Sequence, residues 1–372
     1  MRELFVVDGW VREEAPAGAQ IERLPTPPEA FAFAGLVDMH AHTCWPHPPE
    51  KQVDHAAWML ERRAEYASNG VTLIRDMGSA SEASLVQPDV PGLPAVQTCG
   101  TLLAPHAGFP FPATTDAELV ERGIASIKRG AKWVKVFADW SHDFGGREDT
   151  AFTENDPVSY SPAVLAKLVA EAHARGARVA AHAFTPGGCK AAIEAGCDSL
   201  EHAWGVDEAD LEAMRARGIA WVPLLGIAGE MYSSAVAHGG RERAAWIARS
   251  LDRLRRLLPL AERLGVVVLA GTDWHPQVLP SDEVAELIDA GLSRDAAFAA
   301  AATRAREFLH VNLSVVGGRD LVVVPADPRA DPSVLERPLL VAANGTRVDH
   351  SKRTRRPNHL LTRLRMARSA PQ

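Results

Sequence analysis

From about residue 35 onward, short apolar segments alternate with longer amphipathic segments. The apolar segments are rich in Val, Ile and Ala, and the amphipathic ones are long enough for several helical turns. The clearest of these runs from Pro162 to Arg175, with Ser161 in the position of an N-cap and Gly176 as a stop signal. This alternation is typical of βαβ units, whose strands form a parallel sheet.

Eight apolar segments are predicted to be the strands of that sheet. In chain order they are Ala34–His40, Val71–Arg75, Ala95–Gly100, Trp133–Phe137, Arg178–His182, Ser199–His202, Ala220–Leu225 and Val266–Thr272. Most of them are separated by helical stretches, which gives repeated strand–helix units within residues 35–315. We therefore expect an α/β protein whose main domain is a (β/α)8 TIM barrel.

Both chain ends depart from the barrel pattern. The first thirty-odd residues read as short strands broken by Pro and Gly, and apolar runs return at 321–324 and 339–341, followed by the turn signal Asn344-Gly345. We expect residues 1–34 and 316–350 to form one small composite β-sandwich domain beside the barrel. Residues 351–372 carry seven basic residues and no acidic one, which favours a solvated, disordered tail over an anion-binding or subunit-bridging arm.

The composition narrows the class of partner. A net charge of -7 gives no reason to expect nucleic acid or a membrane as the main binding partner. We expect a small-molecule substrate instead. No signal-like segment opens the chain, and the longest apolar runs are too short to cross a bilayer. The four cysteines are scattered without a CxxC pair, as expected for reduced thiols in a cytoplasmic protein. The oligomeric state is left open, a homo-oligomer included.

Residues that can bind a metal ion stand at the ends of five predicted strands. They are His40 and His42 on the first strand, Lys135 on the fourth, His182 on the fifth, His202 on the sixth and Asp273 after the eighth. Each of them alone has an ordinary structural explanation. Together they mark the carboxyl-terminal rim, where such barrels place their active sites. Because residues i and i+2 of a strand point to the same side, His40 and His42 are predicted to bind one cation.

Lys135 and Asp273 suggest what such a site could do. A lysine inside an apolar strand is costly unless its charge is paired or removed. It either reaches the rim to pair with a carboxylate or reacts with CO2 to give a carboxylated lysine, an anionic bridging ligand. Asp273 can bind metal and also accept a proton from metal-bound water.

These motifs resemble those of the amidohydrolase superfamily. Gly35–His42 is similar to its first-strand motif and Ala270–Asp273 to its last, while Ala180–His202 resembles the prolidase and imidazolonepropionase branch. The resemblance implies a split β-domain and two divalent ions, with zinc expected. It implies that His40, His42 and Asp273 bind the more buried ion, that His182 and His202 bind the second, and that carboxylated Lys135 and a hydroxide bridge them.

The resemblance implies hydrolysis of an amide, peptide-like or cyclic-amide C–N bond by the bridging hydroxide, with a dipeptidase-like activity among the options. Asp273 would carry the proton, and His106 or Tyr232 would stabilise the oxyanion, with a structural role as the alternative for each. Both residues stand in loops that depart from the usual pattern of the branch. A mononuclear deaminase or lactone hydrolase, and a metal-binding scaffold without catalysis, remain the alternative functions.

Overall fold

Two parallel sheets form the centre of the molecule. The computed structural model describes residues 3–44, 55–79, 82–105, 113–140, 157–237, 240–273 and 277–349. One sheet has the order β4–β5–β6 and the other the order β10–β9–β8–β7. Their strands are β4 (Leu36–Ala41), β5 (Val71–Asp76), β6 (Ala95–Thr98), β7 (Trp133–Phe137), β8 (Arg178–Ala183), β9 (Ser199–His202) and β10 (Ala220–Val222). These strands lie within seven of the eight predicted segments or extend them by one residue.

The segment predicted as the eighth strand does not form a regular strand. Within Val266–Thr272, Val268 makes an isolated parallel bridge to Trp221. The segment nevertheless lies between the sheets, because the Met39 amide donates to the Ala270 carbonyl at 2.9 Å. On the opposite side, a parallel bridge joins Leu103 to Val136. The predicted strand at Ala220–Leu225 is also too long, since proline follows Val222 and Leu224 has a left-handed backbone with φ 56°.

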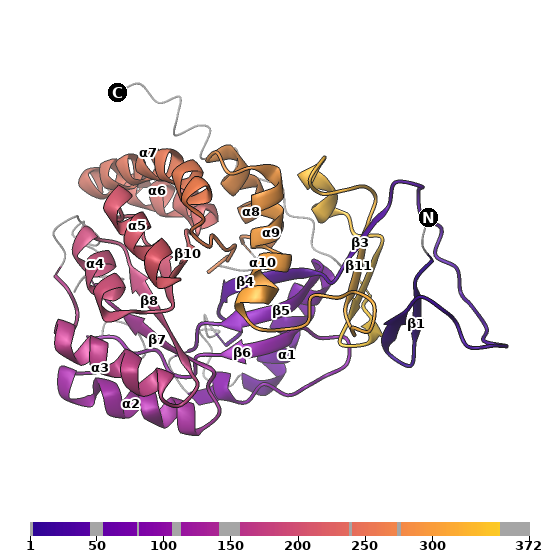
Figure 1. The fold of residues 1–372 in the computed structure, drawn as a ribbon, viewed down its shortest axis with the longest axis horizontal. Coiled ribbons are helices and arrows are strands. Elements are labelled where there is room, and N and C mark those ends of the chain that lie inside the picture. Colours follow the sequence, from indigo (N-terminus) through magenta and orange to yellow (C-terminus); the bar gives the residue numbers. More distant parts are fainter. Residues whose placement is uncertain are drawn as a thin grey trace.

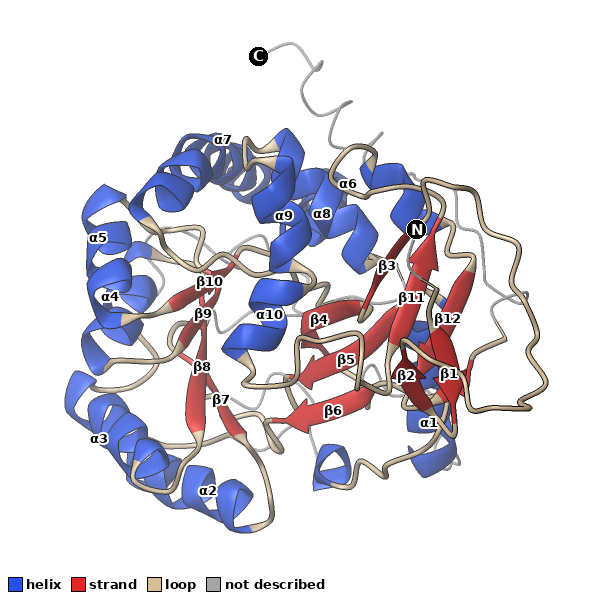
Figure 2. Cartoon of the chain, turned by 45° about the vertical axis from the view of Figure 1, so that its right-hand side comes forward, coloured by secondary structure: helices blue, strands red, loops and turns tan. Residues whose placement is uncertain are grey.

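Helices surround these strands on the outside (Figures 1 and 2). They are α1 (His55–Ser68), α2 (Asp116–Lys128), α3 (Pro162–His173), α4 (Pro186–Ala195), α5 (Glu208–Arg217), α6 (Ala228–Ala237), α7 (Arg241–Leu264), α8 (Pro280–Asp289), α9 (Arg294–Ala300) and α10 (Thr303–Phe308), with short 3-10 turns at η1 (Glu82–Leu85), η2 (Leu225–Ile227) and η3 (Pro332–Glu336). Helix α3 begins as predicted, with Ser161 at its N-cap. No helix of the described segments is both long and apolar enough to cross a membrane.

The two chain ends meet in an antiparallel sheet. Its order is β13–β12–β11–β3. The strands are β3 (Phe31–Phe33), β11 (Leu321–Val324), β12 (Leu340–Ala343) and β13 (Thr346–Arg347), beside a hairpin of β1 (Phe5–Val7) and β2 (Trp10–Arg12). Asn344 and Gly345 have positive φ between β12 and β13, which confirms the predicted turn. The grouping of these strands into one β-sandwich domain remains a prediction, and the tail at 351–372 lies outside the described residues.

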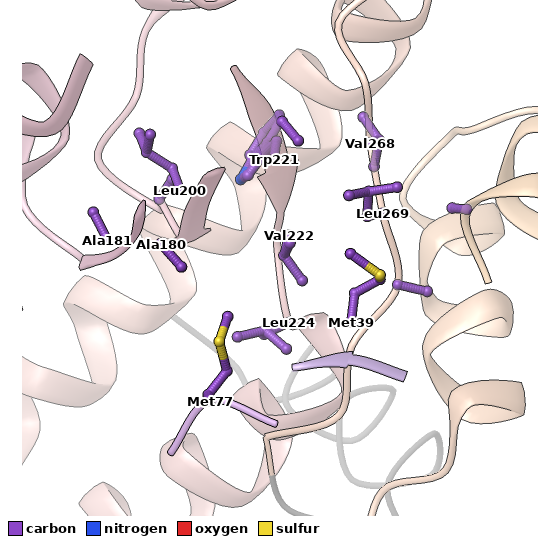
Figure 3. Packing of buried hydrophobic residues seen from close by; sticks show 14 of the residues in the cluster. Met39, Met77, Ala180, Ala181, Leu200, Trp221, Val222, Leu224, Val268 and Leu269 are labelled. Carbon is purple, nitrogen blue, oxygen red and sulfur yellow. The ribbon is translucent and has the colours of Figure 1, made fainter. Parts of the chain in front are cut away.

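An apolar core fills the space between the parallel strands. Met39, Val222 and Leu269 come from separate segments and belong to one buried cluster (Figure 3). Burial on both faces explains why these strands are runs of Val, Ala and Leu rather than alternating patterns. The charged side chains within the strands therefore stand out, and they are the ones that build the site.

Candidate functional site

The structure brings the six predicted ligand residues together. The shortest contacts centre on Asp273, whose Oδ1 lies 3.4 Å from Nε2 of His40 and 3.3 Å from Nε2 of His42. Its Oδ2 lies 3.8 Å from Nε2 of His202. Lys135 Nζ is 3.5 Å from His40 Nε2, and the rings of His182 and His202 are 4.7 Å apart. Lys135 therefore points inward rather than toward the outer helices.

The two histidines of β4 are oriented by hydrogen bonds on their outer nitrogens. Nδ1 of His40 lies 2.8 Å from the Glu201 carboxylate, and Nδ1 of His42 lies 2.8 Å from the Gly78 carbonyl. Both partners are acceptors, so each Nδ1 donates a hydrogen bond to its partner and each Nε2 faces Asp273. The potential ligand atoms of these three side chains all lie within 4.8 Å of one another.

Asp38 of β4 connects this strand to Thr272 through hydrogen bonds. Its Oδ1 accepts from the His40 and Thr272 amides, and its Oδ2 accepts from the Thr272 hydroxyl at 2.6 Å. The amides of Thr272 and Asp273 both donate to the His40 carbonyl. Asp273 has φ 58°, a conformation that non-glycine residues rarely adopt. Complete burial raises the pKa of Asp38 to about 7, although its hydrogen bonds lower it.

Glu201 of β9 is held in place by a hydrogen bond from Arg75 of β5. Arg75 donates from Nη2 to Glu201 Oε1 at 2.8 Å, from Nη1 to the Ser199 hydroxyl at 2.8 Å and from Nε to the Met39 carbonyl at 2.7 Å. Both charged side chains are fully buried. Burial raises the pKa of Glu201, but the Arg75 charge and the His40 hydrogen bond outweigh it and lower the pKa to about 2.

Lys135 lies among these groups with 1% of its surface exposed. Burial lowers the pKa of its amine to about 8, and the nearby Glu201 and Asp273 charges oppose that shift. An amine with a lowered pKa is neutral in a larger fraction of molecules at physiological pH. A neutral amine is the form that reacts with CO2.

The second pair of histidines has a different, aromatic environment. The Phe184 ring stacks on His202 at 4.2 Å between centroids, and the Phe137 ring lies 4.5 Å from that of His182. Burial holds the pKa of both imidazoles well below its usual range. His202 has φ 64° at the end of β9, and its buried Nδ1 has no hydrogen-bond partner within the described segments.

Asp139, just after β7, joins this half of the site to the next strand. Its carboxylate accepts from the amides of Phe184 and Thr185 and from the Thr185 hydroxyl, at distances between 2.7 and 3.0 Å. Its Oδ1 also lies 4.0 Å from His182 Nε2. Gly188 gives the carboxylate room, because a Cβ there would stand 2.0 Å from Asp139 Oδ2.

The donor set suits a divalent metal ion. Neutral imidazole nitrogens, a carboxylate and a buried amine are gathered where water has little access, and imidazole with carboxylate is a common zinc donor set. The buried Nδ1 of His202 is a further polar atom that lacks a partner among the described residues. The residues present therefore fit such an ion.

Tyr232, one of the two predicted oxyanion residues, is not part of this cluster of contacts. It lies in α6, where it is half-buried and packs against the main apolar cluster. His106 lies outside the described residues. Their catalytic roles remain predictions.

Sequence reasoning assigned no role to Asp38, Arg75, Asp139 or Glu201. All four are almost fully buried. One signal was available, because Arg75 and Glu201 are charged residues inside predicted strands, and a buried charge needs a partner. The same argument was applied to Lys135. It would have marked Arg75 and Glu201 as buried charges that need partners, but it does not show that they pair with each other.

Residues 31–308 match the sequence profile of the Amidohydrolase family. The chain belongs to the amidohydrolase family. This amidohydrolase is 31% identical over 356 residues to an uncharacterised protein of Mycobacterium tuberculosis, an alignment that covers 92% of this chain and 91% of that protein. It is also 31% identical over 222 residues to ochratoxinase of Aspergillus niger, which covers 56% of this chain and 45% of that protein.

The fold of this amidohydrolase is similar to that of a Xaa-Pro dipeptidase solved with methionine bound in its active site. The TM-score is 0.70 at 21% sequence identity, with 86% of this chain and 87% of that chain covered. This likeness shows a shared fold. It is a hydrolase that acts on carbon–nitrogen bonds in small molecules.

Proposed function

We propose that this chain is a dinuclear metal-dependent amidohydrolase that cleaves an amide or peptide-like bond of a small molecule. The observation that carries the proposal is the convergence of the six predicted ligand side chains around Asp273 and Lys135. They come from the ends of β4, β7, β8 and β9 and from the end of the segment 266–273. Support also comes from the family match and from relatives called ochratoxinase and Xaa-Pro dipeptidase.

The ligand atoms divide into two groups. His40, His42 and Asp273 would hold one ion, and His182 and His202 the other, with carboxylated Lys135 between them. Divalent ions, with zinc expected, would supply Lewis acidity and lower the pKa of water toward about 7. Lys135 favours the dinuclear arrangement, because a buried amine that reacts with CO2 becomes a bridging anion and releases a proton.

Asp273 is the residue we propose as the proton carrier. Its carboxylate is a quarter exposed, whereas the three imidazoles around it are more deeply buried. Burial raises its pKa, but the surrounding histidines hold that pKa well below the usual range. Asp273 is therefore ionised when substrate arrives and can accept a proton and donate it to the leaving nitrogen.

We further propose that residues 266–272 complete an eight-stranded barrel. The proposal is supported by the bridge from Val268 to Trp221 on one side and by the bond from the Met39 amide to the Ala270 carbonyl on the other. The same reasoning assigns residues 1–34 and 316–350 to one composite β-domain, because β3 pairs with β11. A closed barrel would place all six ligands on one rim.

The test is hydrolysis of a defined panel by the metal-loaded protein. The panel contains Xaa-Pro and other dipeptides, ochratoxin, cyclic amides, lactones and amino-substituted heterocycles that deaminases use. We expect turnover of at least one amide or dipeptide, and we expect Asp273→Asn to lose it while retaining metal. Turnover confined to the deaminase substrates would support the mononuclear alternative. Bound metal without any turnover would support the scaffold.

A further inference from the structure

Glu201 forms a bridge between a buried arginine and the first histidine of the site. One carboxylate oxygen, Oε2, lies 2.8 Å from His40 Nδ1, and the other, Oε1, accepts from Arg75 and from the Ser199 hydroxyl. We propose that Glu201, held by Arg75, is the positioning residue that fixes the proton of His40 on Nδ1 and turns its Nε2 toward the metal ligands. This inference rests on the proposed function and extends it to residues outside the ligand set.

The chemistry of the contact allows one arrangement of protons. An ionised carboxylate only accepts hydrogen bonds, so the nitrogen that faces it must carry the proton. Neutral imidazole has a single N–H, and its other nitrogen is then the acceptor. His40 Nε2 consequently presents its lone pair to the space beside Asp273 and Lys135. A carboxylate behind a metal-binding imidazole also makes that imidazole a stronger ligand.

Glu201 has no freedom to turn away from His40. Arg75 and Ser199 both engage Oε1, which leaves Oε2 for the imidazole. Glu201 and Arg75 are 0% exposed, so water does not compete for the carboxylate. Arg75 also donates from Nε to the carbonyl of Met39, the residue before His40. One guanidinium thereby sets both the backbone of β4 and the acceptor for its histidine.

The Arg75 guanidinium is also held by aromatic packing. The Arg75 guanidinium lies 4.6 Å from the centre of the Trp133 ring, and Arg178 lies 4.0 Å from the centre of the same ring. These contacts add Trp133 of β7 and Arg178 of β8 to the surroundings of Arg75. A buried ion pair is by itself weak grounds for a stabilising role, since desolvation offsets much of the attraction. A role in orienting His40 gives the pair a function that stability alone does not.

Glu283 offers a matched control for a merely structural carboxylate. It is also fully buried. Its hydrogen bonds within the described segments come from the amides of Leu225 and Gly226, at 3.0 and 2.7 Å. A Glu→Gln change at either position replaces one fully buried carboxyl group by an amide while preserving side-chain shape. The two variants differ in that the Glu201 carboxylate contacts His40.

The experiment compares E201Q and E283Q as metal-free, full-length proteins. Zinc affinity is measured by competition with a chromophoric chelator, and the Co²⁺-loaded proteins are compared by their visible absorption. The side-chain amide introduced in E201Q would be free to present its NH2 group to His40 Nδ1, which forces the proton onto Nε2. We expect E201Q to bind zinc about 10- to 100-fold more weakly than wild type and to change the Co²⁺ bands. E283Q should match wild type in both readouts.

The outcomes separate the two proposals. A wild-type protein that binds no zinc or cobalt would contradict the proposed function itself. A wild type that binds metal, together with an E201Q variant of unchanged affinity and unchanged Co²⁺ spectrum, would overturn the positioning role, whatever its melting temperature. If E201Q does not fold, R75K takes its place, because lysine keeps the charge but cannot reproduce the separate hydrogen bonds of the guanidinium to Glu201, Ser199 and Met39. Wild-type metal affinity in R75K would likewise overturn the inference.

Discussion

Two adjacent glycines at the start of α4 should respond in opposite ways to the same substitution. A Cβ at Gly187 would meet its nearest neighbour, a Val158 methyl, at 3.5 Å, which is ordinary contact. A Cβ at Gly188 would stand 2.0 Å from Asp139 Oδ2 and 2.5 Å from its Cγ. Neither glycine has a positive φ, so the backbone accepts alanine at both positions. The two substitutions therefore differ in the contacts of the added Cβ.

The size of the Gly188→Ala effect follows from what Asp139 must give up. The carboxylate would have to retreat by roughly 1 Å to reach a tolerable contact. It is 1% exposed and accepts bonds from the Phe184 amide and from both the amide and the hydroxyl of Thr185. Each bond to a charged group contributes about 1.5–3 kcal/mol. Water does not reach the buried carboxylate to replace the hydrogen bonds that it loses. We therefore expect Gly188→Ala to destabilise the protein by about 3–5 kcal/mol.

Gly187→Ala should instead leave stability unchanged or raise it by about 0.5–1 kcal/mol, because alanine restricts the unfolded chain and favours the helix. Urea unfolding followed by circular dichroism measures the free energy of both variants against wild type. Equal stabilities for Gly187→Ala and Gly188→Ala, whether both unchanged or both reduced, would refute the idea that Asp139 fixes the end of β7 to the start of α4.

Two further predictions concern the surroundings of the site. Burial raises the pKa of Glu283 from 4.5 to about 8, so its contribution to stability is complete below about pH 4.5 and is lost as the pH rises through 8. Glu283→Gln should therefore gain stability relative to wild type, by about 4 kcal/mol, between pH 5 and pH 8.5 in urea titrations; a pH-independent difference would contradict this. A Cβ at Gly271 would lie 2.7 Å from Cβ and 2.8 Å from N of His40. Gly271→Ala should cost about 1–3 kcal/mol and weaken zinc binding in a chelator competition, and wild-type affinity would speak against close packing at this point.

Much of the framework could be predicted because it depends on local patterns. The bounds of β7 and β9 agree with the predicted segments, since each is a short run buried on both faces. The ligand residues could be grouped from the sequence, because the ends of neighbouring parallel strands meet on one rim. Residues 266–272 occupy the place of the eighth predicted strand without forming a regular one. The chain then turns at residues 272–273, where both amides bond to the His40 carbonyl.

The partners of the ligand residues could not be predicted in the same way. Arg75 and Glu201 are 126 positions apart, and a sequence does not say which buried charges pair across a core. The orientation of His40 depends on that pairing and therefore also escaped prediction. Asp139 follows a predicted strand, but its contact with the start of α4 depends on the space left at Gly188.

Calorimetric titration of the metal-free protein with Zn²⁺ tests the central claim most directly. The titration is run on wild type and on Lys135→Met, which keeps the volume of the side chain and removes the amine. We predict two equivalents of zinc per wild-type chain and fewer in the variant, because the bridging group is lost. A wild-type chain that takes up one equivalent, with the same stoichiometry and affinity in Lys135→Met, would contradict a dinuclear site bridged by Lys135.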